Sequence, residues 1–339
     1  MNALHDHLCR YDAGAWREAI DTLSAEIHPI DLNATRIWFA FFPLDLQMAL
    51  AEASDPQETE RKLGLMGRWR LADQIDESHR FLFAHRYWPQ VKSAVGKDGI
   101  PLVNLAPLIS AVAETAARTA RVDREFLLGM SAVALMTLRQ VGPAAFAAAP
   151  GSIAISDRAR AMSPHQVLRR RARDDGQGLF GFLRGLKKQW TVTFDENDPQ
   201  AHFTVIEGQE IASGAQSDQR DYRSRDERCI PGEGPIPVEC RAASCGTCWV
   251  GILGGAEKLS PVVDRDERRR MKVFGYIDSS EERPLIRLAC QARAHGGVSL
   301  VIPPWTGLIA SCVRSPSESA APDRSDRGSP VSRSQSAPR

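Results

Sequence analysis

The chain has 339 residues, of which 43% are hydrophobic and 25% are charged, and its formal net charge at pH 7 is +1. This length allows two domains together with some disordered sequence. A net charge this close to zero argues against a protein that binds nucleic acid or an anionic membrane over its whole surface. The N-terminus lacks the apolar run of a signal peptide, and the longest apolar stretch, residues 126–138, is too short to span a bilayer. We therefore expect a soluble, cytoplasmic protein.

Residues 1–150 predict an all-α domain of five or six helices. Near its start, apolar residues recur at the four- and three-residue steps of one helix face: Trp16, Ile20, Leu23 and Ile27. Asn33 is a candidate N-cap for the next helix, which Pro43 is expected to bend or end. The helical pattern continues over 71–88 and 105–140, and residues 126–138 are expected to be a buried helix.

Residues 151–188 predict a basic linker that contains a short helix. Its basic residues include Arg169, Arg170, Arg171, Arg173, Arg184, Lys187 and Lys188. A basic run of this kind is usually a solvated surface. The alternative is an electrostatic docking strip for an acidic partner or an anionic surface.

From Trp190 the hydrophobic period changes to two, which indicates strands. Two short strands are expected around the turn at 195–200, and three more further on, within 248–255, 284–290 and 297–303. Residues 260–275 begin with Ser-Pro and read as a helix, so the order of elements describes a small mixed sheet packed on a helix.

The segment 313–339 has no aromatic residue and almost no large apolar one. Such a segment cannot bury enough apolar surface to offset the entropy of ordering it, so we expect a disordered tail.

Seven cysteines in a chain without an export signal argue against a disulfide framework. Four of them form one constellation, and the other three are scattered at Cys9, Cys229 and Cys312. The constellation has the spacing C-x₄-C-x₂-C followed by a distant fourth cysteine, and consists of Cys240, Cys245, Cys248 and Cys290. A structural zinc site usually draws on two closely spaced pairs of ligands, which this arrangement lacks. The spacing is instead that of a [2Fe–2S] cluster held by four thiolates.

The residues between these cysteines suit a cluster. Ala242, Ala243 and Gly246 are small, so the backbone can wrap closely around it and point N–H groups at its sulfurs. Ser244 and Thr247 can add hydroxyl donors.

The stretch from "PVECRAASCGTCWVGILGG" to "RPLIRLACQARAHGGVSLVIPPW" resembles the 2Fe–2S ferredoxin family of the β-grasp fold, over about 190–305. The resemblance implies that Cys240 and Cys245 hold one iron, and that Cys248 and Cys290 hold the other. It also implies redox partner proteins, a reductase and an acceptor. We therefore divide the chain into a helical domain (1–150), a linker (151–188), a 2Fe–2S ferredoxin-like domain (189–312) and the tail.

Two features depart from the family pattern. Between Cys248 and Cys290 the expected helix carries Arg265, Arg268, Arg269, Arg270 and Lys272, where related ferredoxins are acidic, so partner recognition through a basic patch on the partner is put in doubt. Residues 213–235 form an insertion ahead of the cysteine loop, and Cys229 within it is interpreted as an incidental thiol.

The leading hypothesis is a one-electron carrier whose helical domain selects or anchors a redox partner. The strips 169–173 and 265–272 are the candidates for the surface that faces the partner. The sequence contains no dinucleotide-binding or P-loop motif, and we name no catalytic residue. The alternative is an iron–sulfur sensor whose cluster state controls a protein interaction of the helical domain. An enzyme with its site in that domain is a third, weaker possibility.

Other candidate sites are weaker. His5, His7 and Cys9 are a conceivable metal clip near a terminus, although the spacing is more simply accidental. His79 and His85 are expected to belong to a helical core. Trp249 follows the third cysteine and is expected to shield the cluster from water, to pack the strand, or both.

Overall fold

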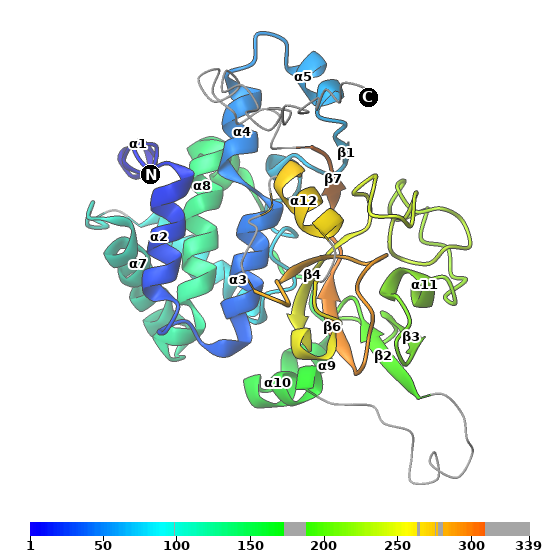
Figure 1. Ribbon diagram of the computed structural model, residues 1–339. Coiled ribbons are helices and arrows are strands. Elements are labelled where there is room, and N and C mark those ends of the chain that lie inside the picture. The colour runs from blue at the N-terminus through cyan, green and yellow to red at the C-terminus, as the bar shows by residue number, and fades with distance from the viewer. Residues whose placement is uncertain (98, 173–187, 263–264, 275, 277–280, 309–339) are drawn as a thin grey trace, which may run out of the picture.

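A computed structural model describes residues 1–97, 99–172, 188–262, 265–274, 276 and 281–308. Helices from the first half of the chain gather on one side of the molecule, and a mixed sheet from the second half lies on the other (Figure 1). The predicted disordered tail and Cys312 lie outside the described residues, as do Arg173, Arg184 and Lys187 of the basic linker.

The first part of the chain is helical, as predicted, and its described residues form eight α-helices rather than five or six. They are α1 (Asn2–Leu8), α2 (Ala13–Leu23), α3 (Pro29–Phe41), α4 (Leu44–Ala51), α5 (Pro56–Lys62), α6 (Trp88–Gly96), α7 (Leu105–Ala120) and α8 (Leu128–Ala148). Helix α3 begins at Pro29 with His28 as its N-cap, so the prediction that Asn33 caps it is wrong. Proline suits this position because the first N–H of a helix has no partner within the helix. Pro43 lies just beyond the end of α3, as expected.

The predicted helix over residues 71–88 is wrong. This segment holds the two short 3₁₀ turns η1 (Leu71–Gln74) and η2 (Phe83–Tyr87). The carboxylate of Asp31 in α3 accepts the backbone N–H groups of Phe83 at 2.6 Å and of Ala84 at 2.8 Å. Because a distant side chain takes these N–H groups, the start of η2 is fixed by tertiary contacts.

Helix α8 is the buried helix that the sequence predicts. Every residue from Leu128 to Leu138 is buried, and Gly142, with φ of 80°, kinks the helix just before Pro143. The preceding helix α7 ends where Arg121 adopts a left-handed conformation, and the turn η3 (Arg124–Phe126) leads into α8. Among the described residues, no helix is long and apolar enough to cross a membrane.

The predicted strands of the second half are present. The sheet has the strand order β3-β2-β6-β4-β5, with β2 and β6 parallel and the other neighbours antiparallel. Its strands are β2 (Gln189–Thr193), β3 (His202–Ile206), β4 (Trp249–Gly254), β5 (Ile286–Leu288) and β6 (Val298–Val301). The remaining helices and turns of this half are α11 (Ile211–Ala215), η5 (Ala256–Lys258) and the predicted α12 (Arg265–Val273).

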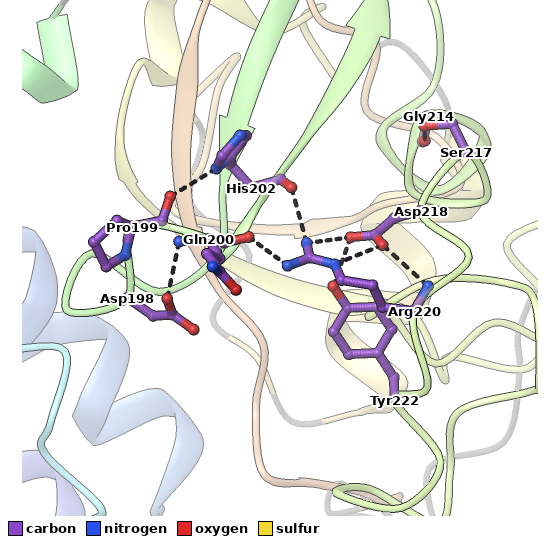
Figure 2. Close-up of polar contacts among 9 residues, drawn as sticks. All are labelled: Asp198, Pro199, Gln200, His202, Gly214, Ser217, Asp218, Arg220 and Tyr222. Atoms are coloured by element: carbon purple, nitrogen blue, oxygen red, sulfur yellow. Dashed lines mark hydrogen bonds and ion pairs between the residues drawn. The ribbon is translucent and has the colours of Figure 1, made fainter.

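The insertion ahead of the cysteine loop is fastened to the hairpin of β2 and β3 by Arg220. Its guanidinium group pairs with Asp218 and donates to the carbonyl oxygens of Gln200 at 2.6 Å and His202 at 3.1 Å (Figure 2). The hydroxyl of Tyr222 donates to the same Asp218 at 2.5 Å. These contacts give the insertion a fixed attachment beside the sheet.

The helical region and the sheet share one hydrophobic core. Helix α3 packs directly on β4, where a Cβ at Gly251 would overlap the side chain of Ile37. Two helices of the predicted linker, α9 (Asp157–Ala161) and α10 (Pro164–Ala172), follow α8, and α10 contacts α3, β4 and β6.

The end of the described chain returns to the helical region. The short strand β1 (Met66–Gly67) pairs with β7 (Trp305–Thr306), although the sequence suggests no strand in the first half. Trp305 is 2% exposed and donates its indole N–H to the carbonyl oxygen of Phe41 at 2.7 Å. Beside this pair, Arg228 of the insertion donates to the carbonyl oxygen of Pro303 at 2.7 Å.

Candidate metal centre

The four cysteines of the predicted constellation lie at one end of two neighbouring strands. Cys248 immediately precedes β4, and Cys290 comes two residues after the end of the antiparallel strand β5. The N–H of Ala289 donates to the carbonyl oxygen of Cys248 at 2.9 Å, which holds the two strand ends together. Cys240 and Cys245 lie in the loop that leads into β4.

The cysteine loop is wound tightly around the sulfur of Cys240. Arg241 and Ala243 have positive φ angles of 54° and 55°, which is uncommon for residues other than glycine. This winding turns three backbone N–H groups toward Cys240 Sγ: those of Ala242 at 3.4 Å, Ser244 at 3.3 Å and Cys245 at 3.3 Å. Converging N–H groups of this kind form a site that favours negative charge.

Burial divides the four thiols into two pairs. Cys248 and Cys290 are 1% and 7% exposed, whereas Cys240 and Cys245 are half-buried. Gln291 donates its side-chain N–H to Cys290 Sγ at 3.4 Å, and Cys245 Sγ lies 3.1 Å from the hydroxyl of Thr247.

Hydrogen bonds lower the pKa of one thiol in each pair. Burial alone would raise the pKa of Cys240, but hydrogen bonds from Ser244 and from the amides of Ala242 and Cys245 lower it to about 6. Hydrogen bonding with Cys248 lowers the pKa of Cys290 to about 6, and the same contact together with burial raises the pKa of Cys248. The thiolate, the form in which cysteine binds metal, is therefore favoured at Cys240 and Cys290.

An aromatic wall closes the buried side of the loop. A Cβ at Gly246 would overlap the ring of Phe274, which follows α12, so only glycine allows this approach. Trp249 is 1% exposed and packs edge-on against Phe274 and Tyr276, with ring centroids 5.7 Å and 4.9 Å away. Trp249 thus packs at the start of β4, next to the buried Cys248. This position suits both roles expected for it, shielding a cluster from water and packing the strand.

The residues present fit a two-iron cluster. In the described parts of the chain, no three His, Cys, Asp or Glu side chains meet around one point in a way that would hold a single metal ion. A [2Fe–2S] cluster needs no such point, because four thiolates share two irons across an elongated core. The inward N–H groups, the small residues of the loop and the lowered pKa values of Cys240 and Cys290 all suit that core.

The other sequence candidates do not form a site. His5 Nε2 lies 3.7 Å from Cys9 Sγ, but His7 bonds to the carbonyl oxygen of Val103 at 2.8 Å, so the described structure does not assemble the clip of all three residues. Cys229 is buried and lies 3.5 Å from the carbonyl oxygen of Pro235, and burial raises its pKa to about 11, which fits an inert thiol.

The basic strip at residues 169–171 is not uniformly solvated. Arg171 is 5% exposed and forms a two-pronged ion pair with Glu196, at 2.7 Å and 2.8 Å, while neighbouring Arg169 is exposed. The reading of this run as a solvated surface is therefore wrong for Arg171. It is buried because its charge is matched by a carboxylate from the turn after β2.

Two residues that support the site escaped the sequence analysis. Arg287 and Glu267 are each 1% exposed and pair at 2.9 Å, and Glu267 also accepts the N–H of Leu288 at 2.9 Å. This pair fastens α12 to the strand that leads to Cys290. An arginine inside the otherwise apolar "PLIRLAC" was the available signal, because a charge in a buried strand needs a partner.

Comparison with known protein families identifies this region. Residues 231–295 match the model of the 2Fe-2S iron-sulfur cluster binding domain, a span that includes all four cysteines. The match confirms the resemblance found in the sequence and the cluster expected from it. No solved structure gave a significant match to the chain.

Proposed function

Because residues 231–295 are a ferredoxin-type 2Fe-2S cluster binding domain, we propose that the protein is a one-electron carrier. The observation that carries the proposal is the tight loop around Cys240, whose three inward N–H groups favour the extra negative charge of a reduced cluster. The cluster supplies the redox chemistry when it is bound. The chain supplies the thiolates, the N–H groups and the aromatic wall that keeps water from the buried side.

The proposed ligands are Cys240 and Cys245 for the outer iron, and Cys248 and Cys290 for the inner one. The division into a half-buried pair and a buried pair supports this assignment. So does the adjacency of Cys248 and Cys290 at the ends of β4 and β5.

We further assign the second half of the chain to the β-grasp fold. The support is its topology: an antiparallel hairpin of β2 and β3, a parallel pairing of β2 with the last strand β6, and β4 and β5 on the far side. The domain limits 189–312 and the linker 151–188 belong to the same proposal.

The helical region, residues 1–150, is proposed to select or anchor the redox partner, a reductase or an acceptor. The support is the direct packing of α3 on β4, which fixes the position and orientation of the helices relative to the cysteine loop. A partner held by the helices would then meet the cluster in one orientation.

The experiment compares two cysteine variants of the purified full-length protein. Cys245→Ala should abolish the visible absorbance and the EPR signal of the reduced cluster. Cys229→Ala is the matched control, because this thiol lies nearby in the chain but bonds only to the carbonyl of Pro235 in the described structure, and it should retain both signals. A wild-type protein that is colourless and lacks acid-labile sulfide would contradict the proposal.

The shared core also favours a second candidate function, a redox sensor. In that case the cluster state would change a contact made by the helical region through α3 and β4. Stopped-flow reduction by a ferredoxin reductase separates the two functions. Fast electron transfer to an acceptor supports the carrier, whereas slow exchange with a large state-dependent change in partner affinity supports the sensor.

A further inference from the structure

A pocket lies where the helical region, the linker helices and the sheet meet. Side chains from the segment before α6, from α9 and α10, and from the turn between β2 and β3 line it. Its apolar lining includes Phe83, Met162 and Val167, the last of which is buried at 7% exposure. Three arginines also line it: Arg80, Arg86 and Arg170.

Arg86 is held in the pocket without a hydrogen bond to a carboxylate. Its guanidinium group donates to the carbonyl oxygens of Phe83 at 2.9 Å and Met162 at 3.0 Å, and it lies 3.6 Å from the centre of the Phe83 ring. Burial lowers the pKa of Arg86, which indicates that its charge has lost part of its hydration.

The other two arginines have spare donors. Arg80 reaches Asp195 at 3.4 Å, but its buried Nε has no hydrogen-bond acceptor within the described structure. Arg170 is half-buried, and in the described part of the chain it forms no hydrogen bond or ion pair. A buried donor without an acceptor costs free energy, so Arg80 favours an added acceptor.

The nearby carboxylates are already engaged elsewhere. Glu196 accepts both prongs of Arg171 and the hydroxyl of Ser299 at 2.6 Å. Asp31 accepts the two N–H groups of η2 and is fully buried. Of the three arginines, Arg80 has long contacts to Asp195 at 3.4 Å and Glu77 at 3.8 Å. Arg86 and Arg170 form no hydrogen bond or ion pair with a carboxylate in the described part of the chain, although Glu196 lines the same pocket.

We infer that this pocket binds a phosphate or sulfate group through Arg80, Arg86 and Arg170. Guanidinium groups bind such tetrahedral oxyanions with paired, charge-assisted hydrogen bonds. The pocket offers N–H donors of this kind beside the apolar side chains of its lining. The bound anion would join the helical region to the sheet at the side of the molecule that carries α9 and α10 (Figure 1). The inference does not depend on electron transfer, because none of the cysteines takes part.

The test titrates sodium phosphate into the full-length protein with its cluster bound, at constant ionic strength set with sodium chloride. Binding heat is measured by calorimetry and thermal stability by tryptophan fluorescence. We expect a saturable heat and a rise in Tm of about 2 °C at a tenfold excess over Kd, with sodium sulfate acting similarly and sodium acetate weakly.

Two neighbouring variants separate this site from general charge effects. Arg170→Gln should weaken phosphate binding at least tenfold, because it removes a guanidinium group that lines the pocket. Arg169→Gln removes the same charge one residue away on the exposed side of α10 and should bind like wild type. The inference is overturned if phosphate produces no more effect than chloride, or if the two variants lose binding equally.

Discussion

Asp31, His79 and His85 are titratable residues buried in the helical region, each at most 1% exposed. The two histidines hydrogen-bond to one another through their Nδ1 atoms at 2.7 Å. Burial raises the pKa of Asp31 to about 6, against the influence of its backbone hydrogen bonds and of Arg171 and Arg86. Burial lowers the pKa of His85 to about 4, with a further contribution from Arg80 and Arg86, and it also lowers the pKa of His79.

These shifts make opposite contributions to the pH dependence of stability. Below pH 6.5 the unfolded histidines bind protons that the folded pair does not, so the pair lowers the free energy of unfolding as the pH falls. Folded Asp31 binds a proton from about pH 6 downward, whereas unfolded Asp31 does so only near pH 3.8, so it raises stability over the same range.

Lowering the pH from 7 to 5 should reduce the free energy of unfolding of wild type. We predict that this reduction is about 2 kcal/mol smaller in His85→Gln, because the variant lacks one of the histidines that take up a proton on unfolding. In Asp31→Asn the same change of pH should reduce the free energy of unfolding by about 1 kcal/mol more than in wild type, because the variant lacks the opposing contribution of Asp31. Urea unfolding at the two pH values, followed by tryptophan fluorescence, measures both differences. Identical pH dependence in wild type and both variants would show that these groups titrate normally.

Helix α12 acts as a support for the cysteine loop. Glu267 in the helix is paired with Arg287 in β5, and Arg287 also donates to the carbonyl oxygen of Ser260 at 2.8 Å. Phe274, directly after the helix, lies against Gly246 of the loop. By holding α12 in place, the Glu267–Arg287 ion pair also holds the ring of Phe274 against Gly246 of the cysteine loop.

Replacing Glu267 by Gln should lower the free energy of unfolding by about 3–5 kcal/mol, because it leaves the buried charge of Arg287 without a counterion. The control is Glu282→Gln, whose carboxylate is 76% exposed and pairs with Arg283 on the surface. That change should stay within about 0.5 kcal/mol of wild type. Urea unfolding compares the two, and equal losses would mean that the buried pair has no special role.

The sequence predicted most of the helices and strands, but not all of their first and last residues. The strands β2 to β6 could be located because each has a local signal, either an alternation of apolar and polar residues or a short apolar run. The segment 71–88 has a helical pattern, yet it forms two 3₁₀ turns because Asp31, some fifty positions earlier, takes the N–H groups at the start of η2. A local pattern contains no information about such a partner.

The whole molecule is built around a core that runs from the helices into the sheet. Ile37 in α3 is fully buried and lies against Gly251 in β4, near the strand end that carries Cys248. The pairing of β1 with β7 and the Trp305 contact to Phe41 join the two halves a second time. We therefore expect the helical region and the cluster domain to unfold together.

Ile37→Ala should lower stability by about 2–5 kcal/mol through the cavity it leaves. If the core is cooperative, the midpoints for tryptophan fluorescence and for the visible absorbance of the cluster should fall together on heating. Leu102→Ala is the control, since Leu102 is 50% exposed and its truncation should leave both midpoints nearly unchanged. A fluorescence midpoint that falls while the absorbance midpoint stays would show that the halves unfold separately.

The sequence by itself determined the helical and strand-rich halves and the cluster domain, because periodicity and the cysteine spacing are local properties of the chain. Only the tertiary structure decided which charges are buried. Arg171 belongs to a basic run and Arg287 to an apolar strand, and neither local sequence identifies the carboxylate partner, which lies 25 positions away for Arg171 and 20 for Arg287. It also decided that Arg170 of α10 lines one pocket together with Arg80 and Arg86 of the segment before α6. Such groups are brought together by the packing of α3, α10 and the sheet, and that packing depends on the whole core rather than on any one segment.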